Sequence, residues 1–142
     1  MDHRVIFGAA LLCIAVHQEA AAQDDLPPCP SSRRLVWNDC RGSYTYDDWS
    51  KYAGAFKNDK RHGQGAMIYP DGQKYSGGFV NDRREGAGVY TNPNGATWTG
   101  EFKNDKPNGR GVLADRSGKV LKEGVWVDGV FVGQAASASP PR

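Results

Sequence analysis

The sequence is poor in the aliphatic side chains that fill most protein cores. Only 18 of the 120 residues after position 22 are Leu, Ile, Val or Phe, a share low enough to suggest disorder on composition alone. Disordered chains are also poor in aromatic residues, yet Phe, Trp and Tyr make up 11% of this sequence. Few aliphatics with many glycines and aromatics indicate short strands and tight turns, and exclude a large helical core or a nucleotide-binding α/β domain. The length of 142 residues allows one domain at most.

Net charge and histidine are scarce as well. The formal net charge is +2 at pH 7, which is too small by itself to indicate a nucleic-acid partner. His62 is the one histidine after position 22, so a Ser-His-Asp catalytic set is not plausible. We therefore expect no catalytic residue, no metal, no cofactor and no small-molecule substrate, and predict that the chain is not an enzyme.

Residues 1–22 have the features of a secretory signal peptide. Arg4 gives a positive start, residues 5–16 form an apolar run, and Ala20–Ala22 offers a small-residue cleavage site. This apolar run is too short to cross a bilayer as a helix. We expect an exported protein, periplasmic or extracellular, and retention of the leader as an anchor is the alternative.

Removal of the leader takes away Cys13 and leaves Cys29 and Cys40. Two cysteines in an exported chain indicate one disulfide, and closing a ring of this size contributes roughly 3 kcal/mol by the loop-entropy estimate. A metal site is a weak alternative, because two thiols without a nearby histidine cannot complete a tetrahedral site.

A period of 23 residues is the strongest pattern in the sequence. Three consecutive units span residues 52–74, 75–97 and 98–120, with an aromatic at position 1, Gly at 3, Phe at 5, Asn-Asp at 7 and 8, and Gly at 12, 14 and 21. Such self-similarity indicates a repeat protein whose units stack on their neighbours. The recurring residues include Gly54, Phe56, Gly63, Gly65, Gly77, Phe79, Gly86, Gly88, Gly100, Phe102, Gly109 and Gly111.

The units at the two ends are incomplete but in phase. Residues 23–51 form an N-terminal cap and a leading half-unit, in which Cys29 and Cys40 take positions 1 and 12, and Trp49 stands where a glycine is expected. Residues 121–133 form a partial C-terminal unit after one inserted residue. Residues 134–142 are rich in Ala, Ser and Pro, and we expect them to be disordered.

The alternation within each unit predicts one β-hairpin per repeat. Positions 1, 3 and 5 share one face of a strand, Asn-Asp begins a polar turn of about four residues, and the second strand starts near the first glycine of Gly-x-Gly. The predicted fold is all-β, an elongated stack of antiparallel hairpins with aromatic ladders as its core. This spacing predicts that Phe56 faces Gly65, Phe79 faces Gly88, Phe102 faces Gly111, Gly54 faces Met67, Gly77 faces Tyr90 and Gly100 faces Leu113.

Two surfaces are candidate binding sites. Stacking brings the basic turns to one long edge, which either attracts anionic lipid headgroups or only keeps the sheets of neighbouring molecules from pairing. Its candidate residues are Lys57, Lys60, Arg61, Arg83, Arg84, Lys103, Lys106 and Arg110. The second surface is an aromatic groove for a partner strand or a sugar chain, with core packing as the alternative. Its candidate residues are Trp49, Tyr52, Tyr75, Trp98 and Trp126.

Aspartate also recurs at the repeat period. The period places Asp59, Asp82 and Asp105 on successive turns. We expect them to accept hydrogen bonds as caps, because side chains repeated along a stack do not converge as an acid/base pair.

The pattern Tyr-x-Gly-x-Phe-x-Asn-Asp-x-x-x-Gly-x-Gly, which runs from Tyr52 to Gly65, resembles the MORN repeat (membrane occupation and recognition nexus). The resemblance covers residues 52–120 strongly and 121–133 in part, with residues 40–51 as a leading half-unit. It implies a stack of antiparallel hairpins with a shallow groove, and a non-catalytic role in protein–protein association. Phospholipid binding is proposed for some members.

Our hypothesis is therefore an exported binding or assembly module that associates with a protein partner, or with a second copy of itself, through the groove or an exposed sheet edge. The alternative is peripheral binding of anionic phospholipid membranes through the basic turns. Electrostatic binding of that kind weakens with salt, whereas association through the groove depends little on salt.

Overall fold

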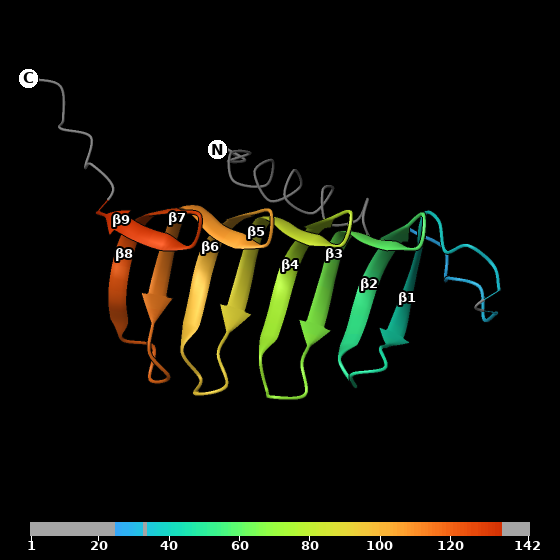
Figure 1. Ribbon diagram of the computed structural model, residues 1–142, viewed down its shortest axis with the longest axis horizontal. Helices are drawn as coiled ribbons and strands as arrows, with labels where there is room; N and C mark the ends of the chain where they lie inside the picture. The colour runs from blue at the N-terminus through green and yellow to red at the C-terminus, as the bar shows by residue number, and fades with distance from the viewer. Residues whose placement is uncertain (1–24, 33, 135–142) are drawn as a thin grey trace, which may run out of the picture.

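The computed structural model describes residues 25–32 and 34–134; the predicted leader, and the predicted tail beyond Gln134, lie outside these residues. The described chain forms one antiparallel sheet of nine strands in the order in which they occur in the sequence (Figure 1). The strands are β1 (Cys40–Thr45), β2 (Lys51–Lys57), β3 (Lys60–Ile68), β4 (Lys74–Val80), β5 (Arg83–Thr91), β6 (Thr97–Lys103), β7 (Lys106–Ala114), β8 (Val120–Val127) and β9 (Val130–Gly133). The predicted all-β stack of hairpins is confirmed.

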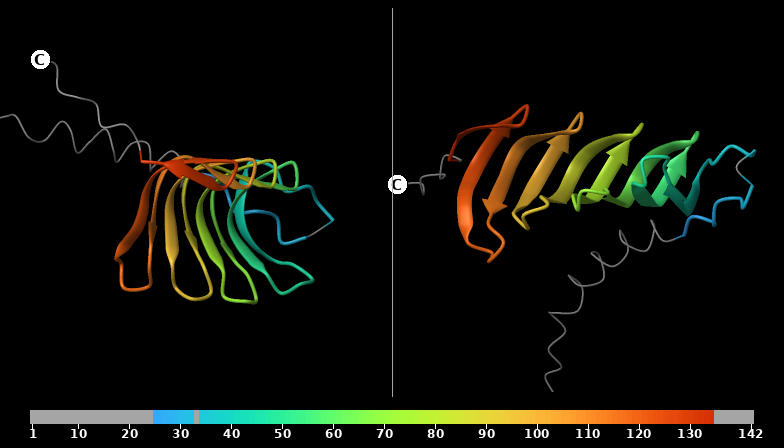
Figure 2. Two further views of the ribbon diagram at one scale, coloured as in Figure 1. Left: turned by 60° about the vertical axis from the view of Figure 1, so that its left-hand side comes forward. Right: turned by 60° about the horizontal axis from the view of Figure 1, so that its bottom comes forward.

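Each 23-residue unit contributes one hairpin. Two-residue turns join β2 to β3, β4 to β5 and β6 to β7 along one edge of the stack, and longer turns containing the position-21 glycine line the other edge (Figure 1). The strand ends curl over beside the two-residue turns, so the sheet is bent (Figure 2). The repeat period therefore sets the spacing of both rows of turns.

The register within each hairpin differs from the predicted one, by four residues next to the turn and by two residues beyond the bulge. Asn58 and Asp59 both have positive φ, 50° and 64°, and close a two-residue turn that matches the twist of the strands. Strand β3 consequently starts at Lys60, not near Gly63, and a bulge then separates two stretches of pairing. The predicted pairs are therefore wrong. The observed pairs are Tyr52 with Met67, Gly54 with Gly65, Phe56 with Arg61, Tyr75 with Tyr90, Gly77 with Gly88, Phe79 with Arg84, Trp98 with Leu113, Gly100 with Gly111, and Phe102 with Pro107.

The sheet has one buried and one exposed face. Along β2, Tyr52, Gly54 and Phe56 are buried, whereas Lys51 and Ala53 on the opposite face are exposed. We call the buried side, which carries the position-1 aromatics, the aromatic face. Its rings form an unbroken series of contacts with centroids 4.7–5.6 Å apart, all but the last of them edge-to-face. In order, the rings are those of Trp37, Phe56, Tyr52, Phe79, Tyr75, Phe102, Trp98, Trp126 and Phe131.

Each two-residue turn is hydrogen-bonded to the unit that precedes it, which is the cap for the first turn and a hairpin for the others. Asp82 Oδ1 accepts the backbone N–H of Arg61 at 2.8 Å, and the Asp82 N–H donates to the Arg61 carbonyl at 3.0 Å. Asp59 bonds to Trp37 in the same way, and Asp105 bonds to Arg84. The predicted role of these aspartates as hydrogen-bond acceptors is confirmed.

The turn between β8 and β9 shows what the aspartate at the second position of the other two-residue turns does. Pro107 occupies the place of Arg61 and Arg84 and has no N–H to donate. The turn that reaches it carries Gly129 in place of the aspartate, and only the Gly129 N–H bond to the Pro107 carbonyl, 2.8 Å long, is formed. The acceptor is thus present where the preceding hairpin offers a donor and absent where it does not.

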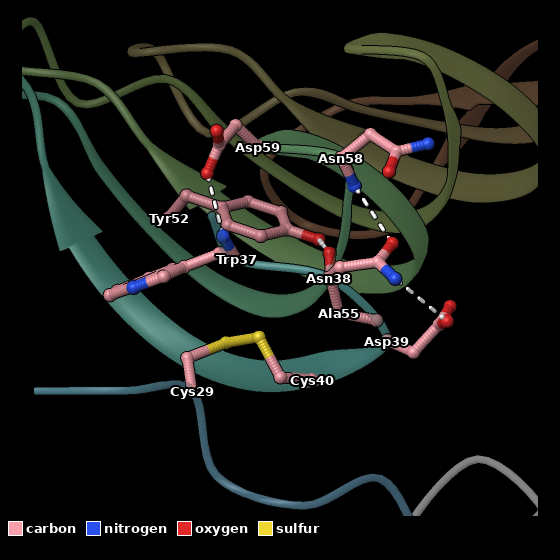
Figure 3. The surroundings of a disulfide bond; sticks show 9 residues. All are labelled: Cys29, Trp37, Asn38, Asp39, Cys40, Tyr52, Ala55, Asn58 and Asp59. Carbon is pink, nitrogen blue, oxygen red and sulfur yellow. Dashed lines mark hydrogen bonds between the residues drawn. A yellow bond between two sulfur atoms is a disulfide. The ribbon is translucent and has the colours of Figure 1, made fainter. Parts of the chain in front are cut away.

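A cap covers the N-terminal end of the stack. The predicted disulfide between Cys29 and Cys40 is formed and joins the cap to β1 (Figure 3). Trp37 lies 4.8 Å from the ring of Phe56 and is 8% exposed. The cap therefore closes the end of the ring series as well as holding the first strand.

Candidate functional site

Four of the five rings predicted to line a groove are part of the core. Tyr52, Tyr75, Trp98 and Trp126 are 1%, 1%, 4% and 5% exposed. The alternative of core packing holds for these four, because neighbouring rings and the bend of the sheet cover them. Trp49 is different: it lies in the longer turn between β1 and β2 and is 76% exposed. The structure does not bring Trp49 together with the other four in one groove.

The buried tyrosines act as hydrogen-bond donors within the bend. The hydroxyl groups of Tyr52 and Tyr75 donate to the carbonyls of Ala55 and Gly78, each at 2.9 Å. Burial raises the pKa of Tyr75 to about 12, and it raises the pKa of Tyr52 as well. Both phenols therefore stay protonated at neutral pH and serve as fixed donors within the core.

Arg61 and Arg84 do not project from the turn edge, although both were predicted to belong to it. Each pairs directly with a phenylalanine of the aromatic face. Arg61 Nε lies 3.1 Å from Asp82 Oδ1, its Nη2 donates to the Asp82 carbonyl at 2.8 Å, and its side chain is 19% exposed. Its guanidinium lies over the rings of Tyr46 and Phe79, 5.7 and 5.4 Å from their centroids.

Arg84 repeats this arrangement one unit further along. Its Nε lies 3.5 Å from Asp105 Oδ1, and its Nη2 donates to the Asp105 carbonyl. The guanidinium lies 5.1–5.6 Å from the centroids of three rings, those of Tyr75, Tyr90 and Phe102. Two guanidinium groups, partly exposed and fixed one repeat apart, therefore line the aromatic face.

The other cations of the predicted basic edge are divided between two places. Five of them are exposed beside the two-residue turns: Lys57, Lys60, Arg83, Lys103 and Lys106. Arg110 is exposed on the opposite face of the sheet, where it pairs with Val125 and lies beside Val112 and Glu123. The basic edge of the structure is therefore smaller than predicted and consists of those five residues.

Half-buried tyrosines complete the accessible part of the aromatic face. Tyr46, Tyr69 and Tyr90 pack against the core with one side, and the Tyr90 hydroxyl donates to Gln73 Oε1. At the N-terminal end, a hollow of about 230 Å³ lies among six residues of the cap and the first strands: Leu35, Trp37, Tyr44, Tyr46, Phe56 and Asp59. Sequence reasoning missed these tyrosines because they do not recur in every unit; strand alternation with the observed register would have found Tyr90.

His62 and the acidic residues are the remaining candidates for a catalytic or metal-binding site. His62 lies partly buried within β3 at the bulge. Within residues 25–32 and 34–134, no three His, Cys, Asp or Glu side chains are grouped as a metal site would require. No helix in that part of the chain is long and apolar enough to cross a membrane.

Trp49→Gly is expected to raise the free energy of unfolding by about 1 kcal/mol, measured by denaturant titration. Trp49 has φ 68°, and the equivalent positions of the next three turns are glycines with φ of 88–92°. The exposed indole loses little burial on removal. Trp49→Ala is the control, since it keeps the unfavourable φ and should bring no gain. A Trp49→Gly variant less stable than its parent would contradict the strain argument.

Comparison with known families agrees with the geometry. The MORN repeat model matches residues 52–74, 75–97 and 98–120, the three units that form successive hairpins. These units are MORN repeats, and the chain belongs to the MORN-repeat family. No curated protein matches the chain in sequence. MORN repeats mediate association with proteins or with membrane lipids, and the general class of function is therefore association.

Proposed function

We propose that this chain is a non-catalytic binding module that associates with a protein partner through its aromatic face. The observation that carries the proposal is the pair of guanidinium groups of Arg61 and Arg84. Each is fixed by an aspartate of the next turn and placed over aromatic rings. Because these side chains are already ordered, a partner does not have to order them on binding, and less entropy is lost.

The residue types of this face also favour a protein partner. Arginine and tyrosine are enriched in the cores of protein interfaces, where one side of the residue is apolar and the other forms hydrogen bonds. Tyr46, Tyr69 and Tyr90 each present such a partly buried ring beside an arginine or along the same face. A segment in extended conformation fits best, because the binding groups repeat along the stack in one direction.

We further place this activity outside the cytoplasm. The apolar leader of residues 1–22 supports export. The Cys29–Cys40 disulfide supports an oxidising compartment, either the periplasm or the extracellular space.

Site-specific photo-crosslinking in the cells that produce the protein tests the proposal. A photoreactive phenylalanine replaces Tyr69 or Tyr90 on the aromatic face, and Ser76 or Thr99 on the opposite face as matched controls. We expect a discrete protein adduct from the first pair and none from the second. Adducts of equal yield from both faces would contradict binding through the aromatic face.

The second candidate function, peripheral binding of anionic membrane, is favoured by the five exposed cations of the basic edge. Each Lys or Arg close to an anionic membrane surface contributes about 1 kcal/mol to binding. Arg61 and Arg84 are unsuitable for testing it, because replacing them also removes the hydrogen bonds to Asp82 and Asp105.

Liposome flotation distinguishes the two functions. The variant Lys60→Gln/Arg83→Gln/Lys106→Gln removes three cations from the basic edge. Its control, Lys51→Gln/Lys74→Gln/Lys119→Gln, removes three exposed cations near the other row of turns. Flotation with anionic vesicles at about 0.05 M salt that weakens at about 0.3 M, and that only the first variant loses, would support membrane binding. No flotation under either condition would leave protein association as the function.

A further inference from the structure

The two edge strands of the sheet, β1 and β9, differ in whether another segment of the chain is hydrogen-bonded to their outward side. At the first edge, the Cys29 N–H donates to the Arg41 carbonyl at 2.9 Å, and the Arg41 N–H donates to the Pro27 carbonyl at 2.8 Å. The disulfide from Cys29 to Cys40 holds this segment against β1 (Figure 3). The outward N–H and carbonyl groups of Arg41, at the start of β1, are thus occupied, and Pro27, Pro28 and Pro30 leave the covering segment with few N–H groups to offer another strand.

The last edge lacks such a cover within the described part of the chain. Strand β9 has one neighbour, β8, and the isolated bridge of the sheet lies at the other end (Figure 1). Edge strands of soluble proteins commonly carry charges that discourage pairing. Each of β1 to β8 contains at least one Lys or Arg, but β9, with the sequence Val-Phe-Val-Gly, contains no charged residue.

In β9, valines stand at positions where the preceding hairpins have polar residues. Val130 stands at the position of Lys60, Arg83 and Lys106, and Val132 at the position of His62, Glu85 and Asn108. Both valines are exposed, at 64% and 60%, and Val127 beside them is 49% exposed. At the positions of Val130 and Val132, where each earlier hairpin has polar side chains, the C-terminal hairpin thus presents valines at a sheet edge.

The ring series is also open at this end. Phe131 is its last member, 4.8 Å from Trp126 and only half-buried. At the other end, Trp37 of the cap covers the series. A further strand paired with β9 would cover Phe131 as each hairpin covers the one before it.

We propose that β9 pairs with β9 of a second copy of this chain, antiparallel, and joins the two sheets into one continuous sheet. A two-fold arrangement sets the strand against itself, so a charge near its centre would face a like charge; β9 has none. The proline-rich segment bonded to Arg41 lies over the start of β1 and hinders pairing of another strand there, so we expect the assembly to close at two molecules and not to grow into a filament. The contact uses a different surface from the aromatic-face site and stands independently of the proposed function.

The turn fixes the register of this contact. Val127 and Val130 flank the two-residue turn Asp128-Gly129 and therefore share backbone hydrogen bonds. By alternation, the N–H and carbonyl groups of Phe131 point away from β8. The two-fold axis then passes beside Phe131, which faces Phe131 of the partner subunit, and Val130 faces Val132 of the partner subunit.

Sedimentation equilibrium of the purified protein tests the dimer. The contact is small, so we expect a dissociation constant on the order of tens of micromolar, with monomer and dimer populated between roughly 5 and 500 µM. Val130→Lys/Val132→Lys places like charges opposite each other across the two-fold axis, which disfavours the pairing, and this variant should remain monomeric while keeping the parent's circular dichroism spectrum. Val80→Lys is the control, because it charges another exposed valine beside a two-residue turn, matches Lys57 and Lys103, and should dimerise like the parent.

Three results would overturn the proposal: a parent that stays monomeric over this range, a dimer that survives Val130→Lys/Val132→Lys, or assemblies that grow beyond two. Register is tested by mixed oxidation in a Cys13→Ser background. Val130→Cys and Val132→Cys chains should form a disulfide dimer when mixed and little when oxidised separately, because each position faces the other across the axis. Equal cross-linking of the separate chains would contradict this pairing.

Discussion

Phe79→Ala is expected to lower the free energy of unfolding by about 3–5 kcal/mol, the usual cost of removing a fully buried phenylalanine. Phe79 is 2% exposed, and its ring lies 5.2 Å from Tyr52 and 5.1 Å from Tyr75. These contacts join the hairpin of residues 52–74 to the hairpin of residues 75–97. The substitution therefore removes the ring through which two neighbouring repeats stabilise each other.

Denaturant unfolding monitored by tryptophan fluorescence measures this cost. Val89→Ala is the control: Val89 lies on the opposite face of β5, is 39% exposed, and should change stability by less than about 0.5 kcal/mol. Because the stability of a repeat stack depends on contacts between nearest neighbours, the Phe79→Ala transition should also broaden. Equal midpoints for Phe79→Ala and the parent would show that the ring series does not hold the stack together.

The period of 23 residues was sufficient to predict the hairpins, their number and their order, because every recurring column has a local structural cause. The register was not predictable from the columns alone. A turn of about four residues after Phe56 and a two-residue turn at Asn58 and Asp59 fit the same spacing. The pairings that they give differ by four residues next to the turn and by two residues beyond the bulge. The positive φ of both turn residues and the bulge after Gly54 decide between them.

The proposed binding surface was harder to predict than the fold. Arg61 and Arg84 belong to a column that Pro107 interrupts, so the column does not appear among the strict repeats. Their partners, Asp82 and Asp105, lie 21 residues further along, and no pattern within one unit shows that the turns of neighbouring units meet. Basic residues close to a turn were therefore assigned to the turn edge, although in the structure the guanidinium groups of these two arginines lie over aromatic rings.

Gly86 and Gly88 are predicted to tolerate alanine very differently, although both belong to the same Gly-x-Gly pair. The Cβ of Gly88→Ala would lie 2.5 Å from Tyr75 Oη and 2.6 Å from Tyr75 Cε2, because the tyrosine ring covers this glycine. We expect a loss of about 3 kcal/mol, as for a methyl group forced into a filled core. Gly86 has φ 78° and no atom within 4 Å of an added Cβ, so alanine should cost only about 1 kcal/mol there, from the backbone.

A double-mutant cycle separates the two causes, with unfolding free energies as the measurement. In a Tyr75→Leu background, the ring over Gly88 is gone, so Gly88→Ala should lose most of its effect, whereas Gly86→Ala should cost the same as in the parent. Identical costs of Gly88→Ala in both backgrounds would mean that the ring does not require this glycine. In the predicted register, Phe79 covers Gly88, and removal of the Tyr75 ring would not relieve the clash. The cycle therefore tests the observed register as well as the packing, because only Tyr75 placed over Gly88 gives the expected coupling.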